Sequence, residues 1–278
     1  MKNFRKKFLV LDCYDNAGIA GLKAAGATQA GVLYKNMLAR FVPEDAVDIV
    51  EISHATAPQI TLDDYQGICW TGSNLFFSAA NDVVQRHIDL CLGFFEVGTP
   101  QFGSCWAAQL AAVATGGRCE QNPKGREFGI ARKITLTEEG ARHPMLKGRP
   151  PVFDGFTSHA DIVTELPKCA THLASNAFSP VQALDVTYGK GRFWAVQYHP
   201  EYDCGEVAAL TILRTADLIT QGTFRDKMAA EKYVGDLRSL NSDSSRRDIA
   251  WKLGLDEDVL DMNARHIEVK NWLNFFFS

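Results

Sequence analysis

The chain has 278 residues, with 29 Lys+Arg against 33 Asp+Glu, so its formal net charge is −4. This length fits one large domain or one domain with an appendage, and it can bury a full core without disulfides. The slightly acidic balance argues against a general nucleic-acid binder, and no apolar run reaches the roughly 18 residues that span a bilayer. The apolar stretch behind the basic N-terminus is too short for a signal peptide. We therefore expect a cytoplasmic protein with no nucleic-acid and no membrane partner.

The first half of the chain alternates short apolar runs with helical patterns. An apolar stripe from Val84 to Phe95 predicts a helix. Runs of apolar residues predict strands at 8–12, 47–52, 67–71 and 100–103. Short buried strands that alternate with helices favour an α/β fold with a mostly parallel central sheet and helices on both faces.

From residue 130 the pattern changes to shorter alternating segments. A turn at 188–191 separates two of them, and a helix resumes at 211–220. Partly antiparallel strands are predicted at 131–136, 170–174, 181–186 and 192–197. These elements complete a predicted α/β domain at 1–221.

The composition shifts after Gly222. Residues 223–240 predict an amphipathic helix, 241–245 a polar break, and two short helices broken at Gly254 follow. We therefore expect a small all-α extension at 222–278. Its large apolar residues would form a patch of a size that soluble monomers rarely expose to solvent. The extension is expected to pack on the α/β domain, on a second copy in a homo-oligomer or on another partner, and to govern assembly or access rather than chemistry.

The seven cysteines show no C-x-x-C spacing, which argues against a zinc knuckle or a thioredoxin-type site. The histidines show no paired ligand spacing, and no glycine-rich phosphate loop occurs. We predict no metal, no nucleotide site and no cofactor. Six of the cysteines are expected to be free thiols packed as small apolar residues.

Cys105 is the exception, because it lies between a short strand and an Ala-rich helix. A strand, a tight turn and a helix in succession present the side chain at the turn and direct the first helical amides toward it. Those amides favour a thiolate and can hold a developing oxyanion. A buried structural cysteine is the alternative.

A thiolate nucleophile needs a base and a group that orients the base. The apolar strand near 193–197 leads to His199, and Pro200 forces a turn that can return Glu201 to the imidazole. A histidine at a strand end followed by a solvated glutamate is the alternative for this pair alone.

Together, residues 103–109 and 197–201 resemble the class I glutamine amidotransferases, in which a G-x-C-x-G-x-Q elbow is followed later by H-P-E. Residues 125–129, 158–161 and 166–167 fall where the family has counterparts, and 70–74 is similar to its oxyanion strand. The resemblance covers about 1–221 and implies a flavodoxin-like arrangement of the sheet. Ala107 departs from the pattern, since the family usually has glycine there, and 72–74 is less glycine-rich than is common.

The resemblance implies a role for each matching residue. Cys105 would be the nucleophile, His199 the general acid and base, and Glu201 the orienting carboxylate. The implied oxyanion-hole residues are Gly72, Ser73 and Trp106, and the implied substrate-binding residues are Gln109, Ser158, His159, Ala160 and Asp161.

The implied reaction is attack of Cys105 on a γ-glutamyl amide, through a thioester, with release of ammonia or an amine. Because too few residues follow 221 for an amination module, the chain would deliver ammonia from glutamine to a separate synthase or act alone on γ-glutamyl amines or peptides. The amidotransferase-like pattern slightly favours glutamine as the substrate. A regulatory binding module is a further alternative, since 248–255 resembles the turn of a helix-turn-helix. Residues 222–278 hold nine Lys+Arg and ten Asp+Glu, so they lack a basic footprint.

Overall fold

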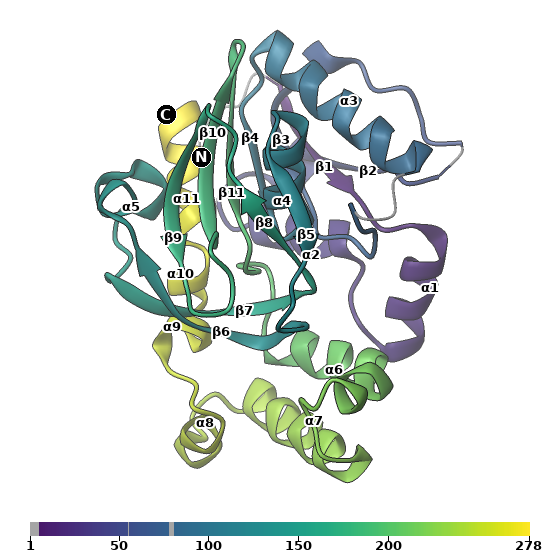
Figure 1. The fold of residues 1–278 in the computed structure, drawn as a ribbon, viewed down its shortest axis with the longest axis vertical. Helices are drawn as coiled ribbons and strands as arrows, with labels where there is room; N and C mark the ends of the chain where they lie inside the picture. Colours follow the sequence, from purple (N-terminus) through teal and green to yellow (C-terminus); the bar gives the residue numbers. More distant parts are fainter. Residues whose placement is uncertain (1–5, 55, 78–80) are drawn as a thin grey trace.

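The computed structural model describes residues 6–54, 56–77 and 81–278. Figure 1 shows a central sheet with helices on both faces and further helices at one end. The strands are β1 (Lys7–Asp12), β2 (Val47–Glu51), β3 (Tyr65–Trp70), β4 (Gln101–Ser104), β5 (Arg118–Gln121), β6 (Glu127–Leu136), β7 (Val152–His159), β8 (Asp161–Glu165), β9 (Ala170–Ser175), β10 (Ala183–Tyr188) and β11 (Gly191–Val196). The helices are α1 (Asn16–Ala25), α2 (Ala30–Leu38), α3 (Asp82–Val97), α4 (Trp106–Ala114), α5 (Glu138–Arg142), α6 (Cys204–Thr220), α7 (Lys227–Ser242), α8 (Arg247–Leu253), α9 (Glu257–Leu260), α10 (Met262–Arg265) and α11 (Ile267–Phe277).

The large sheet has the strand order β2-β1-β3-β4-β11-β10-β9-β6-β7, and β5 pairs with β8 separately. The strands from β2 to β11 in this order run parallel, and those from β11 to β7 pair antiparallel. The predicted α/β fold with helices on both faces is confirmed, and so is the change to antiparallel pairing in the second half. The prediction did not include β5, β7 and β8.

The two faces of β1 show how the core is divided. Phe8 and Val10 pack with α2 and α11 on one face, whereas Leu9 and Leu11 pack with α3 and α4 on the other. A strand buried on both faces is continuously apolar, which is why β1 has no polar alternation. The carboxyl ends of the parallel strands carry the candidate site.

The tail contains more helices than the sequence predicted. After α7 the described residues form α8 to α11, where two short helices were expected. The α11 residue Trp272 is fully buried, and its ring lies 5.9 Å from that of Phe8 and 5.8 Å from that of Phe102. The tail was expected to pack on the α/β domain, on a second copy or on another partner. The structure shows α11 packed on the sheet of the same chain. The division at 221 stays a prediction.

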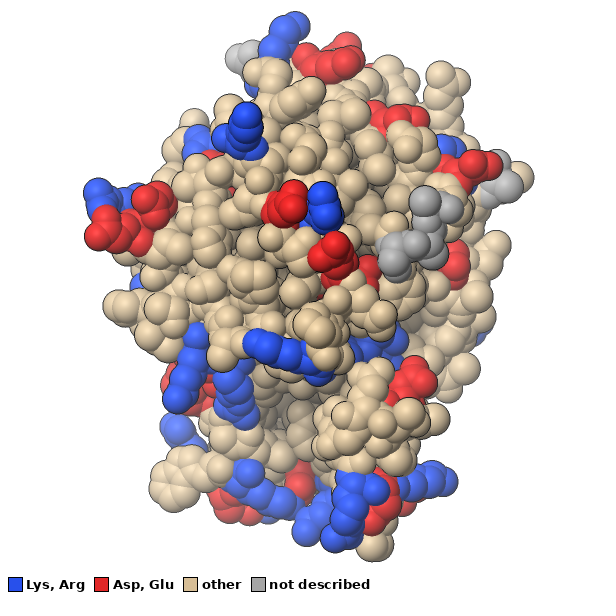
Figure 2. Space-filling view, viewed as in Figure 1, with Lys and Arg blue, Asp and Glu red and all other residues tan. Residues whose placement is uncertain are grey.

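Charges on the face drawn in Figure 2 are mixed in sign. Around α7 and α8, acidic side chains lie among more abundant basic ones, and Lys227–Glu231, Arg246–Asp248 and Lys252–Asp236 form ion pairs. This part of the surface therefore carries no extended field of one sign. In the described ranges, no helix is long and apolar enough to cross a membrane.

Candidate active site

Cys105 occupies a strained turn between β4 and α4. Its φ is 55° and its ψ −101°, a conformation that costs a non-glycine residue about 1–3 kcal/mol. The Cys105 N–H donates to the Val196 carbonyl at 2.8 Å, which ties the turn to β11. A Cβ on Gly103 would lie 2.4 Å from the Ala107 Cβ, so the helix approaches the strand too closely for any side chain there. The methyl group of Ala107 is accommodated because residue 103 is glycine.

His199 lies just beyond β11 and faces the same turn. Its Nδ1 is 2.7 Å from Glu201 Oε1, and both side chains are buried. Within the described part of the chain, its Nε2 has no hydrogen-bond partner. A Cβ on Gly72 would lie 3.0 Å from His199 Cε1 and 3.8 Å from Cys105 Cβ. The structure therefore brings Cys105, His199, Glu201 and Gly72 together.

The charge state of His199 depends on its neighbours. Burial lowers the pKa of the imidazole, but the negative charges of Glu201 and a Cys105 thiolate outweigh burial and raise it to about 10. Tyr202 stacks on the ring with centroids 3.9 Å apart. This environment suits an imidazolium beside a thiolate.

A second buried chain of hydrogen bonds holds Glu201. Tyr34 Oη donates to Ser104 Oγ at 2.7 Å, and Ser104 Oγ donates to Glu201 Oε1 at 2.9 Å. The carboxylate that orients His199 is thereby linked to α2 and to the residue before Cys105. Sequence analysis missed this link.

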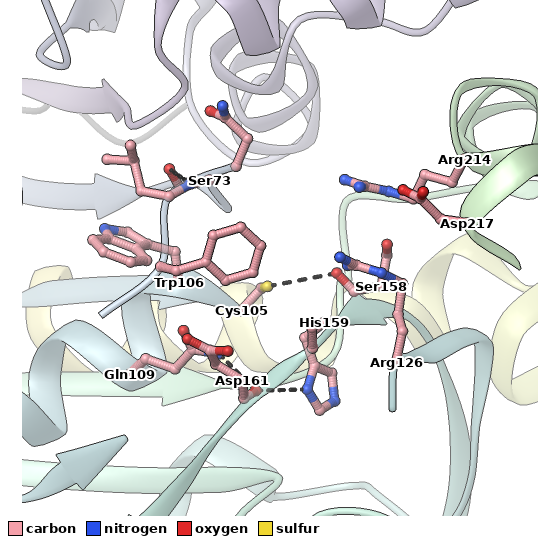
Figure 3. A pocket seen from close by; sticks show the side chains of 14 residues that line it. Ser73, Cys105, Trp106, Gln109, Arg126, Ser158, His159, Asp161, Arg214 and Asp217 are labelled. Carbon is pink, nitrogen blue, oxygen red and sulfur yellow. Dashed lines mark hydrogen bonds between the residues drawn. The ribbon is translucent and has the colours of Figure 1, made fainter. Parts of the chain in front are cut away.

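A pocket of about 220 Å³ opens beside the Cys105 sulfur (Figure 3). Of the residues predicted for the site, all line it except Gly72, His199 and Glu201. No described residue from 222–278 lines it. Asn74 and Arg126 also line it; they belong to the family-like segments 70–74 and 125–129 but were predicted no role there. The lining residues that the sequence did not indicate are Leu75, Phe76, Arg214 and Asp217.

Two predicted substrate-binding residues are held by other parts of the protein. Gln109 Nε2 donates to the Asp161 carbonyl at 2.9 Å and to Gln197 Oε1 at 3.4 Å. His159 contacts Glu127 Oε2 through Nε2 at 2.8 Å and the Asp161 carbonyl through Nδ1 at 2.9 Å. Both nitrogens of His159 are engaged, so its position suits shaping the pocket better than proton transfer at Cys105.

The wall formed by Ser158, Ala160 and Asp161 offers free polar atoms. The Ser158 Oγ and both carboxylate oxygens of Asp161 are buried, with no hydrogen-bond partner among the residues described. Burial raises the pKa of the Asp161 carboxyl, and the backbone N–H of Phe77 and the charge of Arg126 oppose this rise. A carboxylate and a hydroxyl so placed can accept hydrogen bonds from the ammonium group of an amino acid.

The candidate oxyanion-hole residues surround the elbow. Trp106 is the first residue of α4, and Ser73 lines the pocket while its hydroxyl donates to the Cys13 carbonyl at 2.6 Å. Which backbone amides would hold an oxyanion stays a prediction. All seven cysteines are free thiols, and no described cluster of three His, Cys, Asp or Glu side chains is placed to hold a metal.

The histidines give a prediction about pH. In an NMR titration of labelled histidine, His199 should keep its proton until the pH approaches about 10. Because that pKa exceeds the ordinary histidine value of 6.5, the stability that His199 contributes is complete below pH 6.5 and is lost as the pH rises through about 10. Glu201→Gln and Cys105→Ala should each lower the midpoint of the His199 titration, because each removes a negative charge that raises its pKa.

His87 and His266 provide internal controls for this titration. Burial lowers their pKa values to about 4 and about 3, so both should stay neutral from pH 6 upward. A wild-type midpoint for His199 near 6.5 would contradict the ion-pair interpretation.

The geometry can be compared with known proteins. The model of the family described as glutamine amidotransferase class-I matches residues 31–213. A γ-glutamyl-L-1-hydroxyisopropylamide hydrolase from Pseudomonas sp is 32% identical over 220 residues, which are 77% of this chain and 74% of that protein. A glutamine-hydrolysing GMP synthase from Lactococcus lactis subsp. cremoris is 29% identical over 83% of this chain but only 40% of its own length.

A solved structure shares the fold over nearly the whole chain. The glutamine amidotransferase from Methylobacillus flagellatus aligns with a TM-score of 0.64 and 14% identity, covering 98% of this chain and 95% of that one. At this identity the similarity concerns the fold alone. The family match, the Pseudomonas relative and the fold agree, and the chain belongs to the class I glutamine amidotransferase family.

Proposed function

We propose that this protein hydrolyses γ-glutamyl amides, with Cys105 as the nucleophile. The observation that carries the proposal is the strained elbow that presents Cys105 beside a histidine whose Nδ1 is held by Glu201 and whose Nε2 is bound to no other described residue. The Pseudomonas hydrolase supports it, because the similarity covers most of both chains. The similarity to the GMP synthase, in contrast, covers less than half of that protein, so it supports the proposal less.

The proposed reaction has two steps. In the first, the Cys105 thiolate attacks the γ-carbonyl carbon, and the imidazolium of His199 gives its proton to the nitrogen that leaves as an amine. The product is a γ-glutamyl thioester. In the second, neutral His199 takes a proton from water, the resulting hydroxide attacks the thioester, and glutamate leaves with the thiolate restored. Glu201 stabilises the imidazolium and keeps Nε2 directed at the reacting atoms.

The binding of the glutamyl group follows from the unpaired atoms of the pocket. The Asp161 carboxylate would accept hydrogen bonds from the α-ammonium group, and Ser158 would add its hydroxyl. Gln109 and His159 would keep this wall in place through the Asp161 carbonyl. Amides of Trp106 and of Gly72 or Ser73 would stabilise the oxyanion.

A second candidate is a glutaminase that supplies ammonia to a separate synthase. The GMP synthase relative supports it, because it is named as glutamine-hydrolysing. The two candidates share the chemistry at Cys105 and differ in the size of the leaving amine.

The test is glutamate release by the purified protein from glutamine and from γ-glutamyl amides of methylamine, ethylamine and glycine. The proposal expects kcat/KM for at least one substituted amide to exceed that for glutamine. A preference for glutamine would favour the second candidate. Absence of glutamate release from every substrate would contradict both.

Ser104→Ala gives a further prediction about the support of Glu201. The change removes a hydroxyl that donates to Glu201 Oε1, and hydrogen bonds to charged groups contribute about 1.5–3 kcal/mol. We expect kcat to fall by about tenfold with little change in KM. The pH profile of kcat should also shift, because Glu201 sets the pKa of His199. Ser179→Ala is the matched control, because Ser179 is also fully buried but donates to the Val181 carbonyl outside the pocket. Equal losses in the two variants would show a general packing effect instead.

A further inference from the structure

Two arginines line the pocket, and neither has an ion-pair partner among the residues that the structure describes. Arg126 lies between β5 and β6, Arg214 lies on α6, and Asp217 follows on the same helix. The Nε of each arginine is buried without a hydrogen-bond partner, and neither guanidinium has an ion pair within 4.0 Å among the described residues. Figure 3 shows them on one side of Cys105, with Trp106 and Gln109 on the other.

Two guanidinium groups that share a partly buried site repel each other and lose hydration. Burial, followed by the charge of Arg214, lowers the pKa of Arg126 to about 10. Groups of this kind are stabilised by an anion, and the planar guanidinium fork matches a carboxylate. Asp217 contributes one negative charge nearby. The Asp161 carboxylate also interacts with the charge of Arg126, but it is assigned above to the α-ammonium group of the substrate, so one positive charge of the arginines is left for a further anion to balance.

The position of the arginines indicates which half of the substrate they meet. Gln109 is bound to the backbone carbonyl of Asp161, and the Asp161 carboxylate, which has no hydrogen-bond partner among the described residues, belongs to the part of the pocket proposed for the glutamyl group. Arg214 lies on α6, the helix that begins just after His199, and α6 packs with Tyr14 and Tyr202 in one cluster. Tyr202 is the ring stacked on His199. Since His199 gives its proton to the leaving nitrogen, the amine half lies on the side of Arg214.

We propose that Arg126 and Arg214 bind a carboxylate on the amine half of the substrate, so that the preferred substrates are γ-glutamyl derivatives of amino acids. This inference rests on the proposed function and narrows it. The Pseudomonas relative is named for a neutral amine, so the two proteins would differ in the amine they accept.

The experiment compares γ-glutamylglycine with γ-glutamylglycinamide, which has nearly the same shape but lacks the terminal charge. In the wild-type protein, kcat/KM for γ-glutamylglycine should be about tenfold to a hundredfold higher, as expected for a charge-assisted pair of hydrogen bonds. Arg214→Gln and Arg126→Gln should each reduce this ratio by about tenfold. Arg225→Gln is the matched control, because Arg225 is exposed and its partner is the neighbouring Asp226. Circular dichroism verifies that each variant is folded.

Each other outcome overturns the inference in a recognisable way. Equal kcat/KM for the two wild-type substrates would show that no amine carboxylate is bound, while the proposed function would stand. An equal rise in KM for both substrates in Arg214→Gln would assign the arginines to the α-carboxylate of the glutamyl group. Failure to hydrolyse either substrate, glutamine or the alkyl amides would refute the proposed function itself.

Discussion

Replacing Cys105 with alanine is expected to abolish glutamate release, with a loss of at least about 10⁴-fold in kcat. Alanine leaves no nucleophile, so the covalent route closes and His199 has no thiolate to pair with. The fold should persist, because the turn is held by the bond from the residue 105 N–H to Val196 and by the close approach of Gly103 to α4. Glutamate release and thermal unfolding are the two measurements.

Cys169→Ala is the matched control for this experiment. Cys169 is a partly buried free thiol that does not line the pocket, so its loss should leave kcat unchanged. A glutamine-like electrophile should label wild-type protein and Cys169→Ala at Cys105 but leave Cys105→Ala unlabelled. Turnover that survives Cys105→Ala would exclude this cysteine as the nucleophile.

Trp272→Ala is expected to lower the free energy of unfolding by about 3–5 kcal/mol, the usual cost of truncating a buried tryptophan. The indole is fully buried among the rings of Phe8, Phe102 and Phe277. Its removal would leave a cavity between α11 and the sheet. Urea denaturation followed by circular dichroism measures the change.

Trp251 provides the control within the same tail. It is 80% exposed on α8, so Trp251→Ala should change stability by no more than about 0.5 kcal/mol. Similar effects from the two substitutions would contradict the packing of α11 on the sheet. A chain ended after Gln221 should be less stable still, because it would also lose Glu268, which pairs with Arg149 at 2.6 Å and accepts from Tyr198 Oη at 2.7 Å.

The parts of the site that the sequence predicted are local in the chain. Cys105 follows its strand and precedes its helix directly, and Glu201 is two residues from His199, so a single turn sets each geometry. Arg126 and Arg214 belong to different elements that only the fold brings together. Arg126 stands in the family-like segment 125–129, which did not indicate its role, and Arg214 stands in no recognisable motif. Tyr34, Ser104 and Glu201 are likewise far apart in sequence.

The elements that the sequence missed carry polar residues in buried positions. The strand β7 buries Thr157, Ser158 and His159 near the pocket, so it lacks the apolar alternation by which strands are predicted. In α11, the buried Glu268 interrupts the apolar face, and its partner Arg149 is distant in sequence. Ser158 and His159 line the pocket, and Glu268 is paired with Arg149, which is how these buried polar groups are tolerated.

The contact between β1 and α11 has a consequence for how the chain reaches its fold. Phe8, near the beginning of the sequence, packs its ring 5.0 Å from that of Phe277, near the end. Contacts between such distant residues slow folding, because a very long loop must close before they can form. During synthesis, β1 is made long before α11, which together with α2 covers one of its faces. We therefore expect the part of this apolar face that lies under α11 to stay exposed on the nascent chain, and accessible to a chaperone, until α11 is available.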